Sequence, residues 1–494
     1  GSRRHSEGAP FPSPSCHRRP QPCSTMQRAS SVRSAAPGAS SFNLPDRYRF
    51  LKLLGSGSYG VVASFHDTGR GRDVAVKRVR NVWDNFLVLR RTLREIRLMR
   101  HFRHPNVLRM HKVFPVEGTG GDLYLSLELM DCDLENLLKA KTVAISMTQA
   151  RSFCAQMLLG LLAMHSGHVL HRDLKPANIF VRLLDGKVKL GDLGLSRGIA
   201  VDDETGDAIH PTEEHLTEYV VTRWYRAPEV LLARSKYGPP VDVWSVGCIL
   251  YEMWGGKTLF PGKNSYDQLK RICQVTGVPP REQMDWVPPE ALPLFERTVA
   301  GLPGTPGGSG QRAPGLASLV TARVGEEAGD FLEKMCLFDP RKRFDVDQAL
   351  QHPYLRSFVS AEDRQLAKNV APADVAYDKM FDGVGKGGEA VALVQLGRLL
   401  RYEAARDTQP RAPRESPSQS QGVSVATTQG TAPAASHQGC SIVTSAPEPL
   451  PPTPRSAARL AEHARAEEHG RAHPADARGP VDARGPAEPL PRAP

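Results

Sequence analysis

Apolar runs separated by polar and glycine-rich stretches fill the central part of the chain, and the first of them predict β-strands. Residues 50–54 are largely apolar, a glycine-rich stretch follows, and Val61-Val62 resumes the apolar run, so we expect two strands that meet at a hairpin tip. The β-branched run 74–76 predicts a further strand, which ends at Lys77.

Other segments show the spacing of helices. Residues 90–101 (RRTLREIRLMRH) place apolar side chains at helical intervals, with Glu95 as the only carboxylate. The string VDVWSVGCIL predicts a buried helix with Asp242 near its start. Residues 389–406 (EAVALVQLGRLLRYEAAR) again have apolar residues at helical spacing and predict a late helix.

The two ends of the chain lack this patterning. Residues 1–45 are rich in Ser, Pro and Arg, and residues 407–494 are rich in Ala, Pro, Ser and Gln. Neither stretch has apolar periodicity long enough to bury a core, so we expect both to be disordered tails. The sequence opens on Gly-Ser rather than Met, which is typical of a processed chain or a fragment.

Composition excludes several classes of protein. Among 494 residues, 64 Lys and Arg stand against 53 Asp and Glu, and a net charge of +11 is too mild a bias to indicate nucleic-acid binding. The eight cysteines show no C-x-x-C spacing, so neither a zinc site nor a disulfide framework is predicted. No apolar run reaches membrane-spanning length and no secretory signal is seen, so we expect a soluble, intracellular protein without a membrane partner.

The most informative string is VLHRDLKPANIF, which is followed by LGDLGLSR. In it, Asp173 is placed to accept a hydroxyl proton, and Lys175 is close enough to neutralise a transferring phosphate. Asn178 and Asp192 supply hard oxygen ligands for Mg²⁺. Upstream, LGSGSYGVV (54–62) has the G-x-G-x-x-G-x-V arrangement; alone it is as often a plain hairpin, but its glycines also let a backbone close over phosphates. Together the strings predict phosphoryl transfer with ATP and Mg²⁺ as cofactors.

In their order and spacing these strings resemble those of eukaryotic protein kinases. TRWYRAPE (222–229) resembles the end of an activation segment, and Arg343 would pair with Glu229. Asp242 would hold the loop that carries Asp173 through the backbone amides of that loop. The resemblance implies an α+β, bilobal kinase domain over residues 46–355. It would have a small β-rich lobe at about 46–130 and a larger helical lobe at about 131–355, and residues 356–406 would form a C-terminal extension that packs on it.

The resemblance also implies the site residues. Lys77 would meet the ATP phosphates and pair with Glu95, whose alternative is a surface pairing with Arg91. The implied catalytic residues are Asp173, Lys175, Lys77, Glu95 and Thr222, and the metal ligands are Asn178 and Asp192. The nucleotide would be bound by Leu54, Gly55, Ser56, Gly57, Ser58, Tyr59, Gly60, Val62, Ala75, Lys77, Glu128, Met130 and Phe180.

Thr217-Glu218-Tyr219 resembles the activation lip of mitogen-activated protein (MAP) kinases of the extracellular-signal-regulated type, in which the Thr and the Tyr are both phosphorylated. Phosphate groups at Thr217 and Tyr219 would attract arginine forks. Contacts to the helix over 90–101 would then pull Glu95 toward Lys77. The expected phosphate-binding arginines are Arg91, Arg94, Arg172, Arg197, Arg223 and Arg226.

Two alternatives stay open. Some cyclin-dependent-kinase-like enzymes also carry T-x-Y, although Pro176-Ala177-Asn178 and the helix over 389–406 favour a MAP kinase. A scaffold that has lost catalysis is a different class, and the intact catalytic set argues against it. The MAP kinase resemblance implies protein substrates with Ser/Thr-Pro sites, an upstream MAP kinase kinase, phosphatases as further partners, and residence in the cytoplasm and the nucleus.

The sequence departs from the family's pattern at several positions. The metal-binding tripeptide reads Asp192-Leu193-Gly194 rather than D-F-G, and Gly191 precedes it where many relatives have cysteine. Phe180 stands where a smaller residue usually forms the floor under adenine. The acidic patch after HPYL is thin, since Arg364 follows Glu362-Asp363 at once. Partner docking is therefore the part of the resemblance that the sequence supports least.

Overall fold

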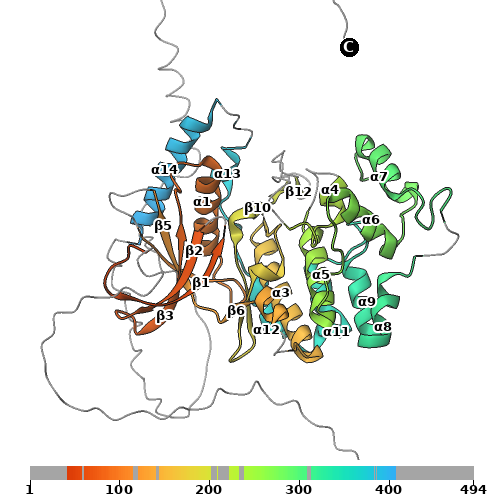
Figure 1. Cartoon of the computed structure of the whole chain (residues 1–494), viewed down its shortest axis with the longest axis horizontal. Helices are drawn as coiled ribbons and strands as arrows, with labels where there is room; N and C mark the ends of the chain where they lie inside the picture. The colour runs from red at the N-terminus through yellow and green to blue at the C-terminus, as the bar shows by residue number, and fades with distance from the viewer. Residues whose placement is uncertain are drawn as a thin grey trace, which may run out of the picture. The chain divides into compact units, whose positions relative to one another are not determined.

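The structure, a computed structural model of the whole chain, describes residues 42–57, 60–114, 121–140, 144–201, 208–209, 222–232, 238–308, 313–382, 384 and 387–407. All of these residues belong to one compact unit of the chain. Figure 1 shows a β-rich part followed by a larger helical part, so the predicted division into a small β-rich lobe and a larger helical lobe is confirmed. Ser58, Tyr59, Thr217, Tyr219 and nearly all of the two predicted tails lie outside the described residues.

The β-rich lobe is built on a five-stranded antiparallel sheet in the order β1-β2-β3-β5-β4. Its strands are β1 (Tyr48–Gly57), β2 (Gly60–Asp67), β3 (Arg72–Val79), β4 (Met110–Phe114) and β5 (Leu123–Glu128). The predicted hairpin is the pair β1–β2, with Gly57 opposite Gly60. Along β3 the side chains alternate: Val74 and Val76 join a small apolar cluster, whereas Ala75 joins the main core. Lys77 therefore shares a face with Ala75 and points toward that core.

Two helices lie beside this sheet, α1 (Phe86–His101) and α14 (Glu389–Ala405), as Figure 1 shows. Helix α1 begins at Phe86 rather than at residue 90, because the Asn85 side chain caps it by accepting a hydrogen bond from the Val88 amide at 3.1 Å. Helix α14 is the late helix predicted from apolar spacing, and its buried residues Leu396 and Leu400 face the core. Helix α14, the last helix described along the chain, thus packs against the β-rich lobe, which is formed by the start of the chain.

The remaining elements belong mainly to the helical lobe. Its helices are α2 (Leu134–Lys139), α3 (Met147–Ser166), α4 (Pro228–Leu232), α5 (Pro240–Gly255), α6 (Ser265–Thr276), α7 (Leu292–Val299), α8 (Leu316–Val324), α9 (Glu326–Met335), α10 (Val346–Gln351), α11 (Pro353–Arg356), α12 (Ala361–Lys368) and α13 (Ala376–Lys379). Short strands are β6 (Cys132–Asp133), β7 (Val169–Leu170), β8 (Ile179–Arg182), β9 (Lys187–Leu190), β10 (Arg197–Gly198), β11 (Ala200–Val201) and β12 (Ala208–Ile209). Single 3₁₀ turns are η2 (Pro176–Asn178), η3 (Leu193–Leu195), η4 (Arg281–Gln283) and η5 (Pro289–Ala291).

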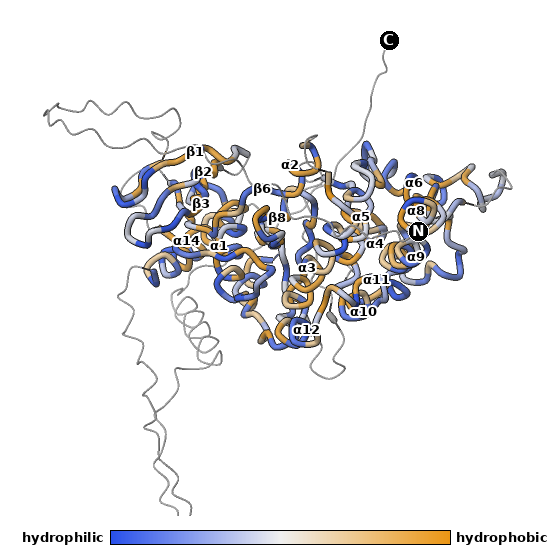
Figure 2. Tube along the Cα trace, turned by 90° about the horizontal axis from the view of Figure 1, so that it is seen from below, coloured by the Kyte–Doolittle hydropathy of each residue, from blue (hydrophilic) through white to orange (hydrophobic). Residues whose placement is uncertain are grey.

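Helices α3 and α5 form the centre of the helical lobe and support the loops that carry the site. The string predicted to be a buried helix is α5, and its residues 241–250 are all buried. Proline at its first position and Gly256 in the left-handed conformation after its end set its two boundaries. Figure 2 shows hydrophobic residues recurring along α3 with hydrophilic ones between them. No helix in the part of the chain that the structure describes is long and apolar enough to cross a membrane.

Candidate active site

The loop that carries Asp173 lies between β7 and η2, and a buried carboxylate holds its backbone. Asp242, in the first turn of α5, accepts hydrogen bonds from the amides of His171 at 2.9 Å and Arg172 at 2.8 Å, and it contacts His165 Nε2 at 2.9 Å. This is the role predicted for Asp242. Burial acts to raise the pKa of Asp242, but the hydrogen bond and charge of His165, with His171 and the Arg172 amide, hold it below its ordinary value. Asp242 is therefore an ionised anchor for the loop.

Three of the predicted catalytic and metal-binding side chains meet on this loop. Lys175 Nζ lies 2.7 Å from Asp173 Oδ2. Asn178 Nδ2 donates to the carbonyl oxygen of Asp173 at 2.7 Å and to its Oδ2 at 3.0 Å. Because the amide nitrogen of Asn178 is used in this way, its oxygen is the atom left to serve a cation. Burial raises the pKa of Asp173 and Lys175 opposes that effect, which is the balance expected of a group that accepts a proton.

Lys77 of β3 and Glu95 of α1 form a two-pronged ion pair. The Lys77 Nζ lies 2.7 Å from Oε1 and 2.8 Å from Oε2 of Glu95, so Glu95 faces the site rather than a surface partner. Burial acts to lower the pKa of Lys77, but the nearby carboxylates of Glu95 and Asp192 outweigh it and raise that pKa. The ammonium group thus stays charged between a helix of one lobe and the Asp192-Leu193-Gly194 tripeptide of the other.

Asp192 follows β9 and has a left-handed backbone, with φ 57° and ψ 66°, which is costly for a residue other than glycine. Leu193 is fully buried, so leucine fills the apolar position where phenylalanine is usual. The carbonyl oxygen of Gly194 accepts a hydrogen bond from Arg94 Nη1. Through this contact α1 is joined directly to the segment that presents Asp192.

These residues fit ATP and Mg²⁺ in their donor chemistry. Asn178 and Asp192 offer hard oxygen ligands, and Mg²⁺ commonly takes its remaining ligands from substrate phosphates and water. The described residues contain no group of three or more His, Cys, Asp or Glu arranged to hold a metal ion. In the glycine-rich hairpin, a Cβ on Gly60 would lie 1.8 Å from the carbonyl oxygen of Arg78, so only glycine fits there. Gly55 and Gly57 have open space beside their Cα atoms among the described residues.

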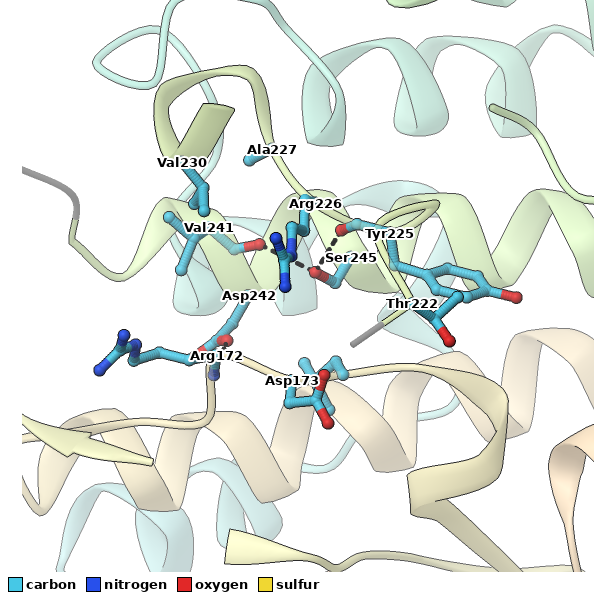
Figure 3. A pocket seen from close by; sticks show the side chains of 11 residues that line it. Arg172, Asp173, Thr222, Tyr225, Arg226, Ala227, Val230, Val241, Asp242 and Ser245 are labelled. Carbon is cyan, nitrogen blue, oxygen red and sulfur yellow. Dashed lines mark hydrogen bonds between the residues drawn. The ribbon is translucent and has the colours of Figure 1, made fainter. Parts of the chain in front are cut away.

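A pocket beside Asp173 is formed by the TRWYRAPE string, by Val230 of α4 and by the start of α5 (Figure 3). In that view Val230 and Val241 lie on the left and Thr222 on the right of Asp173. Ser245 Oγ ties the two walls together by donating to the carbonyl oxygen of Tyr225 at 2.8 Å. The complete lining is Arg172, Asp173, Leu174, Thr222, Tyr225, Arg226, Ala227, Val230, Val241, Asp242 and Ser245.

The pairing predicted between Glu229 and Arg343 is present and fully buried. Arg343 Nη1 lies 2.6 Å from Oε1 of Glu229, and Nη2 lies 3.1 Å from Oε2. This two-pronged contact fixes the end of the activation segment to the body of the helical lobe.

Sequence reasoning missed one acidic residue, Asp378 of α13. Its carboxylate contacts Arg94 and Arg197, two of the arginines expected to bind phosphate. Arg94 Nε lies 2.7 Å from Asp378 Oδ2, and Arg197 Nη1 lies 3.7 Å from the same oxygen. Arg90 Nε lies 2.9 Å from Asp378 Oδ1. Arg223 in turn donates to the carbonyl oxygen of Lys263 at 2.9 Å. The phosphate-binding roles of all six expected arginines remain predictions: Arg91, Arg94, Arg172, Arg197, Arg223 and Arg226.

The two-lobed fold, the Lys77–Glu95 pair and the Asp173–Lys175–Asn178 cluster define a protein kinase. The family model of the protein kinase domain matches residues 48–355. The chain is 39% identical over 322 residues to the mitogen-activated protein kinase SLT2/MPK1 of Saccharomyces cerevisiae, an alignment that covers 64% of this chain and 62% of the yeast protein. It is 38% identical over 324 residues to the mitogen-activated protein kinase mpkA of Aspergillus fumigatus, covering 65% of this chain and 72% of that protein.

Mitogen-activated protein kinase 3 of rice, Oryza sativa, is 40% identical over 316 residues, covering 64% of this chain and 80% of the rice protein. The chain spans less than two thirds of the yeast protein's length but more than two thirds of the length of the Aspergillus and rice proteins. It belongs to the mitogen-activated protein kinase family of serine/threonine protein kinases.

Proposed function

We propose that this chain transfers the γ-phosphate of ATP to serine and threonine hydroxyl groups of protein substrates. The observation that carries the proposal is that the Lys77–Glu95 pair and the Asp173–Lys175–Asn178 cluster both lie near Asp192. The charge of Asp192 acts on both Lys77 and Asp173. Each group has the chemistry that phosphoryl transfer requires, and no member of the catalytic set is missing.

The roles follow from the geometry of the side chains. Asp173 would accept the proton of the substrate hydroxyl, and Lys175, 2.7 Å away, would stabilise the negative charge that develops beside it. Lys77 would orient the ATP phosphates, and Glu95 fixes the position of its ammonium group. Asn178 and Asp192 would hold Mg²⁺, which when bound neutralises phosphate charge.

Substrates would carry proline directly after the acceptor residue. The pocket of Figure 3 adjoins Asp173 and contains the apolar side chains of Ala227, Val230 and Val241, which suit a proline ring better than a polar side chain. Proline also brings no amide hydrogen into a place where a donor would lose its partner.

A pair of peptides that differ at one residue tests this preference. We expect a peptide with Ser-Pro to be phosphorylated at least about tenfold faster than the matched Ser-Ala peptide, since one misplaced buried donor costs about 1–3 kcal/mol. Equal rates on the two peptides would exclude a proline-directed enzyme and leave a serine/threonine kinase of other specificity.

Activation would come from an upstream MAP kinase kinase that phosphorylates Thr217 and Tyr219, with phosphatases reversing the change. The TRWYRAPE segment that follows these residues is fixed by the Glu229–Arg343 pair. The segment that carries Thr217 and Tyr219 would therefore change conformation between two fixed ends, Asp192 and Glu229. Substrates in the cytoplasm and the nucleus would be within its range.

A further inference from the structure

A threonine in the loop after α7 has the local sequence on which the proposed enzyme would act. Thr305 is followed directly by Pro306. Among the residues that the structure describes, no other serine or threonine stands immediately before a proline. The helical lobe of this chain therefore carries a site of the kind proposed for the substrates, a hydroxyl group next to a residue without an amide hydrogen.

The backbone around Thr305 has open space on both sides of the threonine. The described residues 300–308 belong to no helix or strand. Gly304 and Gly307 have positive φ values, 88° and 76°, and a Cβ built on either would meet no atom of the described chain within 4 Å beyond its chain neighbours. Glycine reaches many backbone conformations and a loop without packing partners opens easily. This stretch can therefore straighten to enter an active site at small cost.

The hydroxyl group of Thr305 makes a hydrogen bond that phosphorylation would have to break. Its Oγ1 donates to the carbonyl oxygen of Leu302 at 2.8 Å, and the Thr305 amide donates to the same oxygen at 3.1 Å. Thr305 is half-buried, so water can take over either role when the turn opens. Exchange of one neutral hydrogen bond for another with water costs little, and the hydroxyl group is therefore available as an acceptor of phosphate.

We propose that Thr305 is a phosphorylation site for a second copy of this enzyme, so that active molecules phosphorylate one another. The inference rests on the proposed function. Oγ1 of Thr305 would form a bond to the γ-phosphorus of ATP while the bond from that phosphorus to the β-phosphate oxygen breaks; the proton of Oγ1 passes to Asp173 of the second copy, and ADP leaves. Pro306 would lie in the pocket beside that Asp173, against Val230 and Val241 (Figure 3).

A second copy enters the proposal because the loop is anchored to its own helical lobe. Val299 and Leu302, directly before Thr305, are buried in the main core. Three residues of extended chain span at most about 11 Å, so Thr305 stays close to Leu302. None of the described residues 299–308 lines the pocket beside Asp173. A second molecule can receive the loop while both anchors stay in the core.

The test uses an inactive full-length acceptor. Isotope-labelled Asp173→Ala protein is incubated with MgATP and with wild-type enzyme that has been phosphorylated and then freed of the activating kinase. Mass spectrometry locates phosphate on the labelled acceptor. We expect phosphate on Thr305, and a rate at least about tenfold lower when the acceptor also carries Pro306→Ala. An equal rate on the Pro306→Ala acceptor would overturn the proposed recognition of the loop.

Thr298 of α7 is the matched control within the same acceptor. It is also half-buried, and its Oγ1 also donates to a backbone carbonyl, that of Leu294 at 2.7 Å. It differs in lying in a helix and in being followed by Val299. We expect no phosphate on Thr298, and equal labelling of the two threonines would contradict a site defined by proline and an open loop.

A Ser-Pro peptide in the same reaction separates failure of this inference from failure of the proposed function. Phosphate on the peptide with none on Thr305 would overturn the site and leave the proposed function standing. Phosphate on neither would refute the proposed function itself. Phosphate on Thr305 of the wild-type enzyme that never appears on the labelled acceptor would overturn transfer between two molecules.

Discussion

At the scale of single residues, Asp242 is the group on which the shape of the catalytic loop depends most. Its carboxylate accepts from two consecutive amides of the loop and contacts His165, and it is almost wholly buried. Arg172, whose amide is one of those donors, has φ 69°, a strained conformation for arginine. A single carboxylate thus offsets the strain that places Asp173.

We expect Asp242→Asn to lower kcat at least about tenfold and to reduce the free energy of unfolding by about 1–3 kcal/mol, because an amide group leaves at least one buried donor without its acceptor. Steady-state kinetics and urea unfolding measure both effects. Asp73→Asn is the control, since Asp73 is exposed and its carboxylate contacts His66 Nδ1 at the protein surface at 2.7 Å. Wild-type kcat in the Asp242→Asn protein would show that the loop keeps its shape without this anchor.

At the scale of elements, the C-terminal extension holds α1 in place. Asp378 contacts Arg90 and Arg94 near the middle of α1, and Glu403 of α14 contacts Arg97 and Arg100 near its end. Burial acts to raise the pKa of Asp378, but Arg94 and Arg90 hold it below its ordinary value. The helix that presents Glu95 is therefore fixed by charges from the far end of the described chain.

Asp378→Asn should destabilise the protein by about 3–5 kcal/mol at neutral pH, because it leaves buried arginines without their counter-charge. A depressed pKa means that this stabilisation is complete above the ordinary aspartate value of 3.8 and is lost as pH falls through the lowered pKa. The difference in unfolding free energy between wild type and Asp378→Asn should therefore shrink below about pH 4.

Denaturant unfolding across this pH range provides the measurement, and Asp374→Asn provides the control. Asp374 is four residues away, exposed, and accepts only from the Ala376 amide at 3.2 Å among its described side-chain contacts. A gap between wild type and Asp378→Asn that stays constant down to pH 3 would contradict the anchoring role.

The same elements show how far sequence reasoning reaches. Lys77, Asp173 and Asp192 were predictable because phosphoryl transfer needs these groups at fixed local spacing on recognisable strings. The start of α1 was placed too late because the Asn85 cap precedes the apolar pattern. Asp378 could not be predicted, because it lies 284 residues from Arg94 and a lone aspartate in a short helix carries no local signal. The space that Gly191 leaves for the Phe180 ring likewise depends on a neighbouring strand, since a Cβ at residue 191 would lie 2.6 Å from Cε2 of that ring.

At the scale of the whole molecule, contacts within the described chain already hold α1 and the ion pair that it carries. The Lys77–Glu95 pair is formed, and Asp378 holds α1 through Arg90 and Arg94. Phosphorylation would then act mainly on the segment near Asp173 that receives the substrate. Phosphorylation of Thr217 and Tyr219 should therefore change turnover much more than it changes nucleotide binding.

The double substitution Thr217→Ala with Tyr219→Phe should leave the Kd of MgADP within about twofold of wild type while lowering kcat more than about a hundredfold after treatment with an activating kinase. Calorimetry and a peptide assay give the two numbers. A phosphorylated wild-type sample is the reference. Full turnover by the substituted protein would refute the lip switch, and lost MgADP binding would show that the lip also closes the nucleotide site.

The most direct test of the account is a phosphate-transfer assay that compares wild type with Asp173→Ala, using γ-labelled ATP, Mg²⁺ and a Ser-Pro peptide. The account predicts that wild type labels the peptide and that Asp173→Ala binds MgADP normally but loses at least about a hundredfold in rate, because the proton acceptor is gone. Equal labelling by the two proteins would contradict the assignment of Asp173. Absence of labelling by phosphorylated wild type would favour a scaffold over an enzyme.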